Sequence, residues 1–258
     1  MTLQNAIERV NNEGNQAFIP YIMAGDGGLE NLRATILRLQ QLGATAIEVG
    51  IPFTDPVADG PTIEAAGMRS LKNGTNLTNV LQTLQSFAND VTIPLVIMTY
   101  LNPILAYGAD CFAKDAKAAG VQGIIVPDMP LEERDIIFDA LQKEQLALVQ
   151  LVSLTSPPER VAKLAAASQG FVYAVTVNGI TGARSSFAEN LEHHFNALKA
   201  VSTVPVLAGF GISTPEHVKQ FASLSDGVIV GSKIVDRLQA DDWDTVAALI
   251  IASKKVEV

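Results

Sequence analysis

The stretch TAIEVGIPFTDPVADGPT, residues 45–62, combines a short apolar strand pattern with a long polar loop. Side chains of a strand alternate between its two faces, so Glu48 shares one face with Ala46 while Ile47 and Val49 share the other. The branched pair is typical of a face that packs against helices. Glu48 is therefore expected to point the opposite way, into the interior of a sheet that is buried on both faces.

Short apolar runs of the same kind recur along the whole chain, and segments with helical periodicity separate them. Eight such strand and helix units favour a closed barrel over a doubly wound open sheet, because neither GxGxxG nor GxxxxGK(S/T) occurs. We predict an α/β protein with one domain over residues 1–258, a single (β/α)₈ TIM barrel with extra helices at the N-terminus, after the second strand and near the C-terminus. The strands are expected at 17–22, 45–50, 94–99, 122–127, 146–152, 170–176, 205–210 and 226–231, and the extra helices at 2–12, 62–72 and 242–254.

The composition excludes several classes of function. With 48% hydrophobic and 17% charged residues, the 258-residue chain can bury a large core. A net charge of −9 argues against binding to nucleic acid or anionic membranes, because both require a basic surface. We expect a cytoplasmic protein, since no stretch has the pattern of a signal peptide or a membrane span. The one cysteine, Cys111, excludes an intrachain disulfide and is expected to be a small buried residue.

The carboxylates of the opening stretch are the strongest catalytic candidates. In this fold the active site forms from the carboxyl ends of the strands and the loops after them. Burial inside the barrel is expected to raise the pKa of Glu48 toward the range useful for proton transfer; a structural glutamate with a paired neighbour is the alternative. The following loop brings Asp55 and Asp59 over the barrel mouth. One of the two is expected to form a turn, and capping of the next helix is the alternative role for Asp59.

Glycine pairs after the seventh and eighth strands indicate a phosphate site. The runs AGFGIS (208–213) and GVIVGSKI (227–234) follow the two strands whose loops commonly bind phosphate in this fold. The glycines of the first run allow backbone amides to approach a ligand closely, and Gly231 with Ser232 begins a helix whose N-terminus attracts an anion. Ordinary strand-to-helix turns are the alternative interpretation.

The sixth strand leads into NGITGARSS (178–186), a glycine-rich stretch that we expect to act as a mobile lid. Arg184 within this stretch is either a ligand contact or a solvated surface charge. Tyr173, on the strand itself, either reaches a ligand with its hydroxyl group or is satisfied within the core.

The positions of lysine and histidine narrow the chemistry. No lysine lies at the carboxyl end of a predicted strand, which disfavours a Schiff-base mechanism. The histidines, His193, His194 and His217, fall in helical segments away from the predicted mouth, which disfavours a histidine-bound metal. Of the mechanisms considered, acid–base catalysis by carboxylates on a phosphorylated substrate remains.

A resemblance to a known family covers essentially the whole chain. The motif IEVGIPFTDPVADGPTI (47–63) closely resembles the highly specific signature of tryptophan synthase α chains. The resemblance continues in family order through MTYLNPI (98–104), VPDMPLEE (126–133), NGITGAR (178–184), GFGIS (209–213) and VGSKIV (230–235). It implies a lyase of tryptophan biosynthesis that splits indole-3-glycerol phosphate into indole and glyceraldehyde 3-phosphate by a retro-aldol reaction.

By this resemblance, Glu48 and Asp59 are the catalytic carboxylates. Glu48 is expected to transfer protons, and Asp59 to accept a hydrogen bond from the indole N–H group. The implied substrate contacts are Tyr173 near the indole and glycerol parts, Gly182, Gly211 and Ser232 at the phosphate with Phe210 and Gly231 adjacent, Thr181, and an indole pocket of Tyr21, Ile63, Met98, Ile125 and Ile229. Tyr21 and Met98 depart from the phenylalanine and leucine familiar in the family, with little change in volume.

The resemblance also implies a partner. A tryptophan synthase β subunit is expected to join this chain in an α2β2 heterotetramer. The middle of the loop after the second strand is expected to be exposed and to offer a docking surface, so we expect Asp55 and Pro56 at the interface. No cofactor or metal is implied for this chain, because the pyridoxal phosphate of the complex belongs to the β subunit. The alternatives are a free-standing indole-3-glycerol phosphate lyase, a phosphosugar isomerase or similar barrel, and an inactive regulatory subunit. The PFTDPVADGP loop argues against the isomerase, and retention of both carboxylates argues against the inactive subunit.

Overall fold

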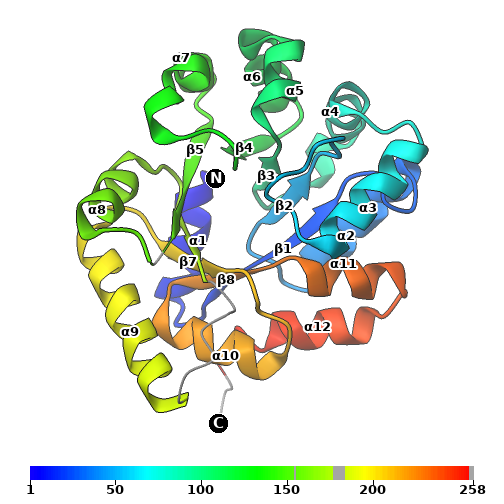
Figure 1. Ribbon diagram of the computed structural model, residues 1–258. Helices are drawn as coiled ribbons and strands as arrows, with labels where there is room; N and C mark the ends of the chain where they lie inside the picture. Colours follow the sequence, from blue (N-terminus) through cyan, green and yellow to red (C-terminus); the bar gives the residue numbers. More distant parts are fainter. Residues whose placement is uncertain (154, 177–183, 256–258) are drawn as a thin grey trace.

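Parallel strands close into a barrel in the part of the chain that the structure describes (Figure 1). The computed structural model describes residues 1–153, 155–176 and 184–255, without the side chains of 184–190. Each strand pairs with the next along the chain, and the eighth pairs with the first. The strands are β1 (Ala17–Met23), β2 (Ile47–Gly50), β3 (Leu95–Met98), β4 (Val121–Ile125), β5 (Ala147–Ser153), β6 (Val172–Val175), β7 (Val206–Gly209) and β8 (Gly227–Val230). The predicted (β/α)₈ barrel is confirmed, and each predicted strand end lies within two residues of an observed one.

Helices surround the barrel, as Figure 1 shows, and the first of them covers its amino-terminal end. They are α1 (Leu3–Asn12), α2 (Leu32–Gln41), α3 (Pro61–Lys72), α4 (Leu77–Ser86), α5 (Leu101–Tyr107), α6 (Ala109–Ala118), α7 (Asp135–Lys143), α8 (Pro158–Ala167), α9 (Arg184–Val201), α10 (Pro215–Leu224), α11 (Ser232–Gln239) and α12 (Trp243–Ile251), with 3₁₀ turns η1 (Leu29–Asn31), η2 (Ala88–Asp90) and η3 (Leu131–Glu133). The predicted extra helices correspond to α1, α3 and α12. The histidines lie on α9 and α10, as expected.

The inside of the barrel is filled with apolar side chains at its amino-terminal end. Leu3 and Ile7 of α1 pack there against Ile19, Ala46 and inward-facing residues of the other strands. Leu3 is 2% exposed, so α1 closes the amino-terminal end of the barrel. A ligand can therefore enter only at the opposite end, where the strands terminate.

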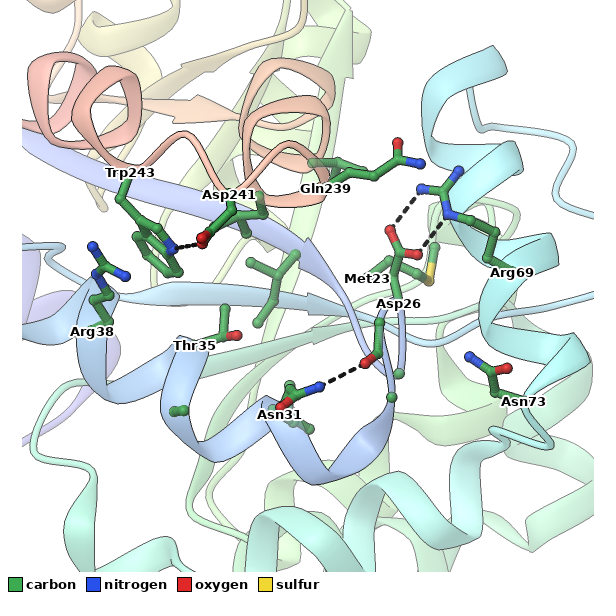
Figure 2. Close-up of a pocket in the computed structure, with 18 of the residues that line it drawn as sticks. Met23, Asp26, Asn31, Thr35, Arg38, Arg69, Asn73, Gln239, Asp241 and Trp243 are labelled. Atoms are coloured by element: carbon green, nitrogen blue, oxygen red, sulfur yellow. Dashed lines mark hydrogen bonds and ion pairs between the residues drawn. The ribbon is translucent and has the colours of Figure 1, made fainter.

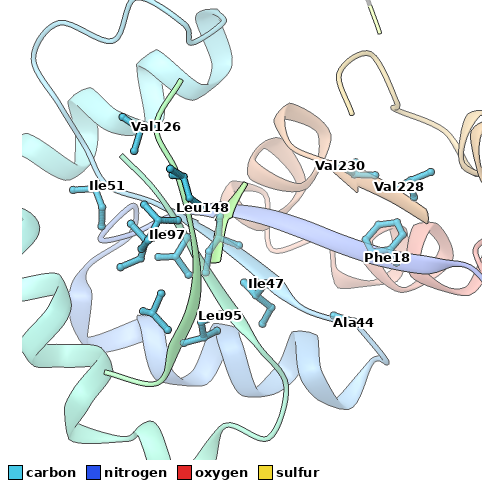
Figure 3. Packing of buried hydrophobic residues seen from close by; sticks show 14 of the residues in the cluster. Phe18, Ala44, Ile47, Ile51, Leu95, Ile97, Val126, Leu148, Val228 and Val230 are labelled. Atoms are coloured by element: carbon cyan, nitrogen blue, oxygen red, sulfur yellow. The ribbon is translucent and has the colours of Figure 1, made fainter. Parts of the chain in front are cut away.

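A second apolar layer lies between the strands and the surrounding helices. Figure 3 shows Ile47, Leu95, Ile97 and Val228 among the side chains of this layer. Full burial of each such side chain stabilises the fold by roughly 1.5–3 kcal/mol. Because Ile47 and Val49 both belong to this outer layer, the residue between them on β2 faces the barrel interior.

The expectation for Cys111 was wrong. Its side chain is exposed, because α6 turns Phe112, Ala113 and Ala116 toward the core and leaves Cys111 on its outer face. Consecutive residues of a helix point about 100° apart, so Cys111 faces solvent although its neighbour Phe112 is buried, and residue type alone did not decide the placement. In the described residues, no helix combines the length and apolar character that crossing a membrane requires.

Candidate active site

A cavity of about 480 Å³ opens at the carboxyl ends of the strands. Cavities of this size accommodate small organic molecules. The structure brings most of the predicted site residues to its lining, namely Tyr21, Glu48, Asp59, Ile63, Met98, Tyr173, Phe210, Gly211, Ile229, Gly231 and Ser232. Residues that the sequence did not indicate complete it: Ala58, Gly60, Ile212, Ser213 and Lys233.

Glu48 lies in this cavity on the inner face of β2, beside Tyr21 of the neighbouring β1. It is 1% exposed, and its Oε2 atom has no hydrogen-bond partner among the described residues. Burial, and after it the negative charge of Asp59, raise the pKa of Glu48 to about 8. At neutral pH the carboxyl group is therefore mostly protonated. Within the described residues, Glu48 forms no ion pair, so the alternative of a structural glutamate with a paired neighbour has no support.

The loop after β2 carries Asp59 to the rim of the cavity. Two turn hydrogen bonds shape the loop, from the Val57 N–H to the Asp55 carbonyl and from the Asp59 N–H to the Pro56 carbonyl, both at 3.0 Å. The N-cap residue of α3 is Gly60, and no side chain caps this helix. Helix capping, the alternative role for Asp59, is therefore excluded.

Tyr100 holds the Asp59 side chain in place. Its hydroxyl oxygen accepts a hydrogen bond from the Ala58 N–H at 3.0 Å, and its O–H group donates a hydrogen bond to the Asp59 carboxylate. Its ring stacks on Phe53 at a centroid distance of 5.3 Å. Burial raises the pKa of Asp59, the hydrogen bond from Tyr100 lowers it, and the charge of Glu64 raises it. Sequence reasoning missed Tyr100, although its position just after the third strand was a usable signal.

Two buried tyrosines, Tyr21 and Tyr173, also line the cavity. Burial raises the pKa of both hydroxyl groups well above the ordinary value, and nearby carboxylate charge adds to the effect. Both are therefore neutral hydrogen-bond donors at neutral pH. Glycine makes room for the rings, because an added Cβ at Gly50 would collide with the Tyr21 hydroxyl group and one at Gly209 would collide with the Tyr173 ring.

The loops after β7 and β8 present unpaired backbone amides. The N–H groups of Gly211, Ile212, Ser232 and Lys233 have no hydrogen-bond partner among the described residues. Ser232 is the first residue of α11, so the positive end of the helix dipole lies at the same place. Free amides and a helix N-terminus together form an environment that suits an anion.

The turn after β7 has an unusual backbone. Phe210 has a φ angle of 72°, a value that few residues other than glycine adopt. The single proton of the Thr176 hydroxyl is shared between the carbonyl oxygens of Gly209 and Phe210, which lie 2.8 and 2.6 Å from the hydroxyl oxygen, and this contact holds the turn in place. The Phe210 ring lies 5.8 Å from that of Tyr173 and covers part of the cavity.

Several predicted site residues lie elsewhere. Ile125 is fully buried in the barrel interior next to Met98 and does not line the cavity. Asp55 and Pro56 lie on the outer side of the loop, where the Asp55 carboxylate accepts a hydrogen bond from Thr54 at 2.6 Å. Thr181, Gly182 and the expected lid at 178–186 lie largely outside the described residues, as does the side chain of Arg184.

A larger cavity of about 700 Å³ lies outside the barrel between α2, α3, α11 and the loop after β1 (Figure 2). Both of its arginines already have partners in the chain: Arg69 makes a bidentate ion pair with Asp26 at 2.7 Å, and the Arg38 guanidinium lies 4.1 Å from the centroid of the Trp243 ring. None of its lining residues has a buried polar side-chain atom without a hydrogen-bond partner, whereas the smaller cavity contains Glu48. The smaller cavity is therefore the better candidate for chemistry. Within the described residues, no group of histidine, cysteine and acidic side chains is arranged to hold a metal.

A closed (β/α)₈ barrel with carboxylates and free amides around the carboxyl ends of its strands is the architecture of a TIM-barrel enzyme. Residues 7–257 match the family model described as tryptophan synthase alpha chain. The chain therefore belongs to the tryptophan synthase alpha chain family. The expectation of a lyase is confirmed by this membership.

Individual relatives agree with the family match. The tryptophan synthase alpha chain of Bacillus cereus is 49% identical over 244 residues, which cover 95% of each chain, and a Bacillus anthracis alpha chain is 48% identical over the same shares. A solved structure of Mycobacterium tuberculosis tryptophan synthase has a TM-score of 0.89 at 34% identity, and the Legionella pneumophila subunit alpha has 0.88 at 32%; both cover 98% of each chain.

Proposed function

We propose that this chain cleaves indole-3-glycerol phosphate into indole and glyceraldehyde 3-phosphate. The observation that carries the proposal is the buried, unpartnered carboxyl group of Glu48, which shares one cavity with Asp59 and a set of free amides. Family membership supports the same reaction. The substrate suits this lining, because it joins an aromatic ring that carries an N–H group to a phosphate.

The first step requires a proton donor at C3 of the indole ring. Glu48 has a raised pKa of about 8 and donates its proton to C3, which leaves positive charge on the ring nitrogen. The Glu48 carboxylate then removes the proton from the hydroxyl group on the side-chain carbon that is bonded to C3. The O–H electron pair forms the aldehyde carbonyl, and the pair of the breaking carbon–carbon bond returns to the ring. Neutral indole leaves, and Glu48 is protonated again.

Asp59 stabilises the charge that develops in this step. Its carboxylate accepts a hydrogen bond from the ring N–H group, where positive charge appears in the transition state. The hydrogen bond from Tyr100 lowers the pKa of Asp59 and thus favours the ionised form that this role requires. Ile63, Met98 and Ile229 supply the apolar surface for the ring.

The phosphate is held by the loops after β7 and β8. We propose that the amides of Gly211 and Ser232 bind its oxygens, with Gly231 and Phe210 adjacent. Gly182 and Thr181 remain proposed contacts. The glycine-rich lid is proposed to exclude water during cleavage.

We propose a tryptophan synthase β subunit as the partner, in an α2β2 heterotetramer in the cytoplasm. The loop after β2 supports this proposal, because Val57 is 82% exposed and Asp55 is exposed next to Pro56. A partner on this surface would fix the loop that also carries Asp59. We propose that this chain uses no cofactor of its own and that indole passes directly to the β subunit.

Release of indole from indole-3-glycerol phosphate tests the proposed reaction. We expect Glu48→Gln to lower turnover by about 10²–10⁴-fold, with Glu133→Gln on the exposed surface as the matched control. A wild-type chain that releases no indole, or a Glu48→Gln variant with near-normal turnover, contradicts the proposal. Strong activation by added β subunit separates a true α subunit from a free-standing lyase, which is fast alone.

A further inference from the structure

Lys233 is the one cationic side chain that lines the candidate active-site cavity within the described residues. The other charged residues of the lining are Glu48 and Asp59. A phosphate group carries a charge between about −1.5 and −2 at neutral pH, as in a phosphorylated side chain, and the acidic side chains of the lining supply no positive charge to balance it. Backbone amides orient a phosphate but add no net charge. A phosphate site built from these amides therefore also needs a nearby cation to balance the charge.

The position of Lys233 fits this role. It is the second residue of α11, directly after Ser232, at the helix end where the amides of Ser232 and Lys233 are unpaired. It is half-buried, and it forms no ion pair with another residue of the described chain. Its four-carbon stem is long enough to bring the ammonium group to an anion bound at the start of the helix.

We infer that the ammonium group of Lys233 pairs with the substrate phosphate and determines its affinity. The inference rests on the proposed function and adds to it a residue that neither the strand pattern nor the glycine pairs indicated. Lysine binds phosphate as a point charge, so arginine at this position retains the attraction. Lys233 acts at the phosphate end of the cavity, away from the proton transfers of Glu48, so its loss affects KM far more than kcat.

Ligands that differ only in the phosphate provide the test. Indole-3-propanol phosphate retains the ring and the phosphate without the glycerol hydroxyl groups, and indole-3-propanol lacks the charge. We expect Lys233→Met to weaken binding of the phosphate ester to the full-length chain by about 10–100-fold, the range of a charge-assisted hydrogen bond. Binding of indole-3-propanol is expected to change less than twofold. Lys233→Arg is expected to stay within fivefold of wild type.

Lys219→Met is the matched control, because Lys219 is an exposed lysine on α10 outside the cavity lining. It should leave both dissociation constants within twofold of wild type. The wild-type affinity for the phosphate ester should also fall more steeply with salt than that of Lys233→Met.

Equal affinity of wild type and Lys233→Met for the phosphate ester overturns the inference. An equal loss for both ligands also overturns it, because it shows a change in cavity shape rather than a lost charge. The proposed function fails separately: a chain that prefers the phosphate ester but releases no indole from indole-3-glycerol phosphate retains the role of Lys233 in binding and loses the proposed reaction.

Discussion

Replacement of Glu48 with glutamine removes a titratable group without changing its size. In the folded chain, Glu48 is 1% exposed, and burial followed by the charge of Asp59 raises its pKa from 4.5 to about 8. In the unfolded chain the same carboxyl group is solvated and ionises near its ordinary pKa. Between these two values the folded protein holds a proton that the unfolded chain has released. The free energy of unfolding is therefore linked to pH through this one side chain.

The sign follows from the direction of the shift. Because the pKa is raised in the folded state, the stabilisation is complete below about pH 4.5 and is lost as the pH rises through about 8. Each pKa unit corresponds to about 1.4 kcal/mol, which sets an upper bound of about 5 kcal/mol for the whole shift. Between pH 5 and pH 8.5 the bound is about 4 kcal/mol. The glutamine variant has no such loss.

Urea denaturation at pH 5, 7 and 8.5 measures this linkage. Trp243 is the single tryptophan of the chain and provides a fluorescence signal. We expect the free energy of unfolding of Glu48→Gln, relative to wild type, to rise by roughly 2–4 kcal/mol between pH 5 and pH 8.5.

The exposed Glu133→Gln variant is the control, and its difference from wild type should stay constant with pH. A difference between Glu48→Gln and wild type that is also constant would show that Glu48 is already ionised in the folded protein. That result would refute the account of Glu48 as a buried acid.

Three further perturbations test other parts of the account. Tyr100→Phe removes the hydrogen bond that lowers the pKa of Asp59, so the acid limb of kcat/KM should move to higher pH; an unmoved acid limb argues against the contact. Asp55→Ala should leave basal indole release and the thermal midpoint nearly unchanged but weaken activation by β subunit, and superimposable titration curves would eliminate its interface role. Leu3→Ala at the closed end of the barrel should cost roughly 2–5 kcal/mol in urea denaturation while kcat stays within twofold, and a large loss of kcat would contradict the separation of core and site.

The barrel and the orientation of Glu48 were predictable from the sequence for a physical reason. A strand has a period of two, so the identity of Ile47 and Val49 as outer-layer residues fixes Glu48 on the inner face. Burial on both faces made each strand a near-continuous apolar run, and such runs stand out in a chain with helical segments between them. Those two periodicities are local, and they were enough to predict the topology.

The contacts that depend on distant segments were not predictable in this way. Tyr100 reaches Asp59 only because the loops after β2 and β3 meet at the barrel mouth. Lys233 lies beyond the end of the eighth strand and was not indicated as a site residue, yet the first turn of α11 brings it to the cavity. Ile125 was expected in the indole pocket, but it is fully buried at the end of β4 beside Met98 and is not among the residues that line the cavity. Each of these placements is decided by packing between elements rather than by the pattern within one.

The central claim is that Glu48 enters the reaction as a neutral acid, and the pH dependence of indole release tests it most directly. The measurement is kcat/KM for indole-3-glycerol phosphate, which reports the ionisation of the free enzyme, from pH 6 to pH 9.5, with wild type and Glu48→Gln. We expect wild-type kcat/KM to fall above about pH 8, as the carboxyl group loses its proton, and the variant to be slower by about 10²–10⁴-fold without that limb. A wild-type kcat/KM that rises through pH 8, or a variant that keeps the wild-type profile, would contradict the claim.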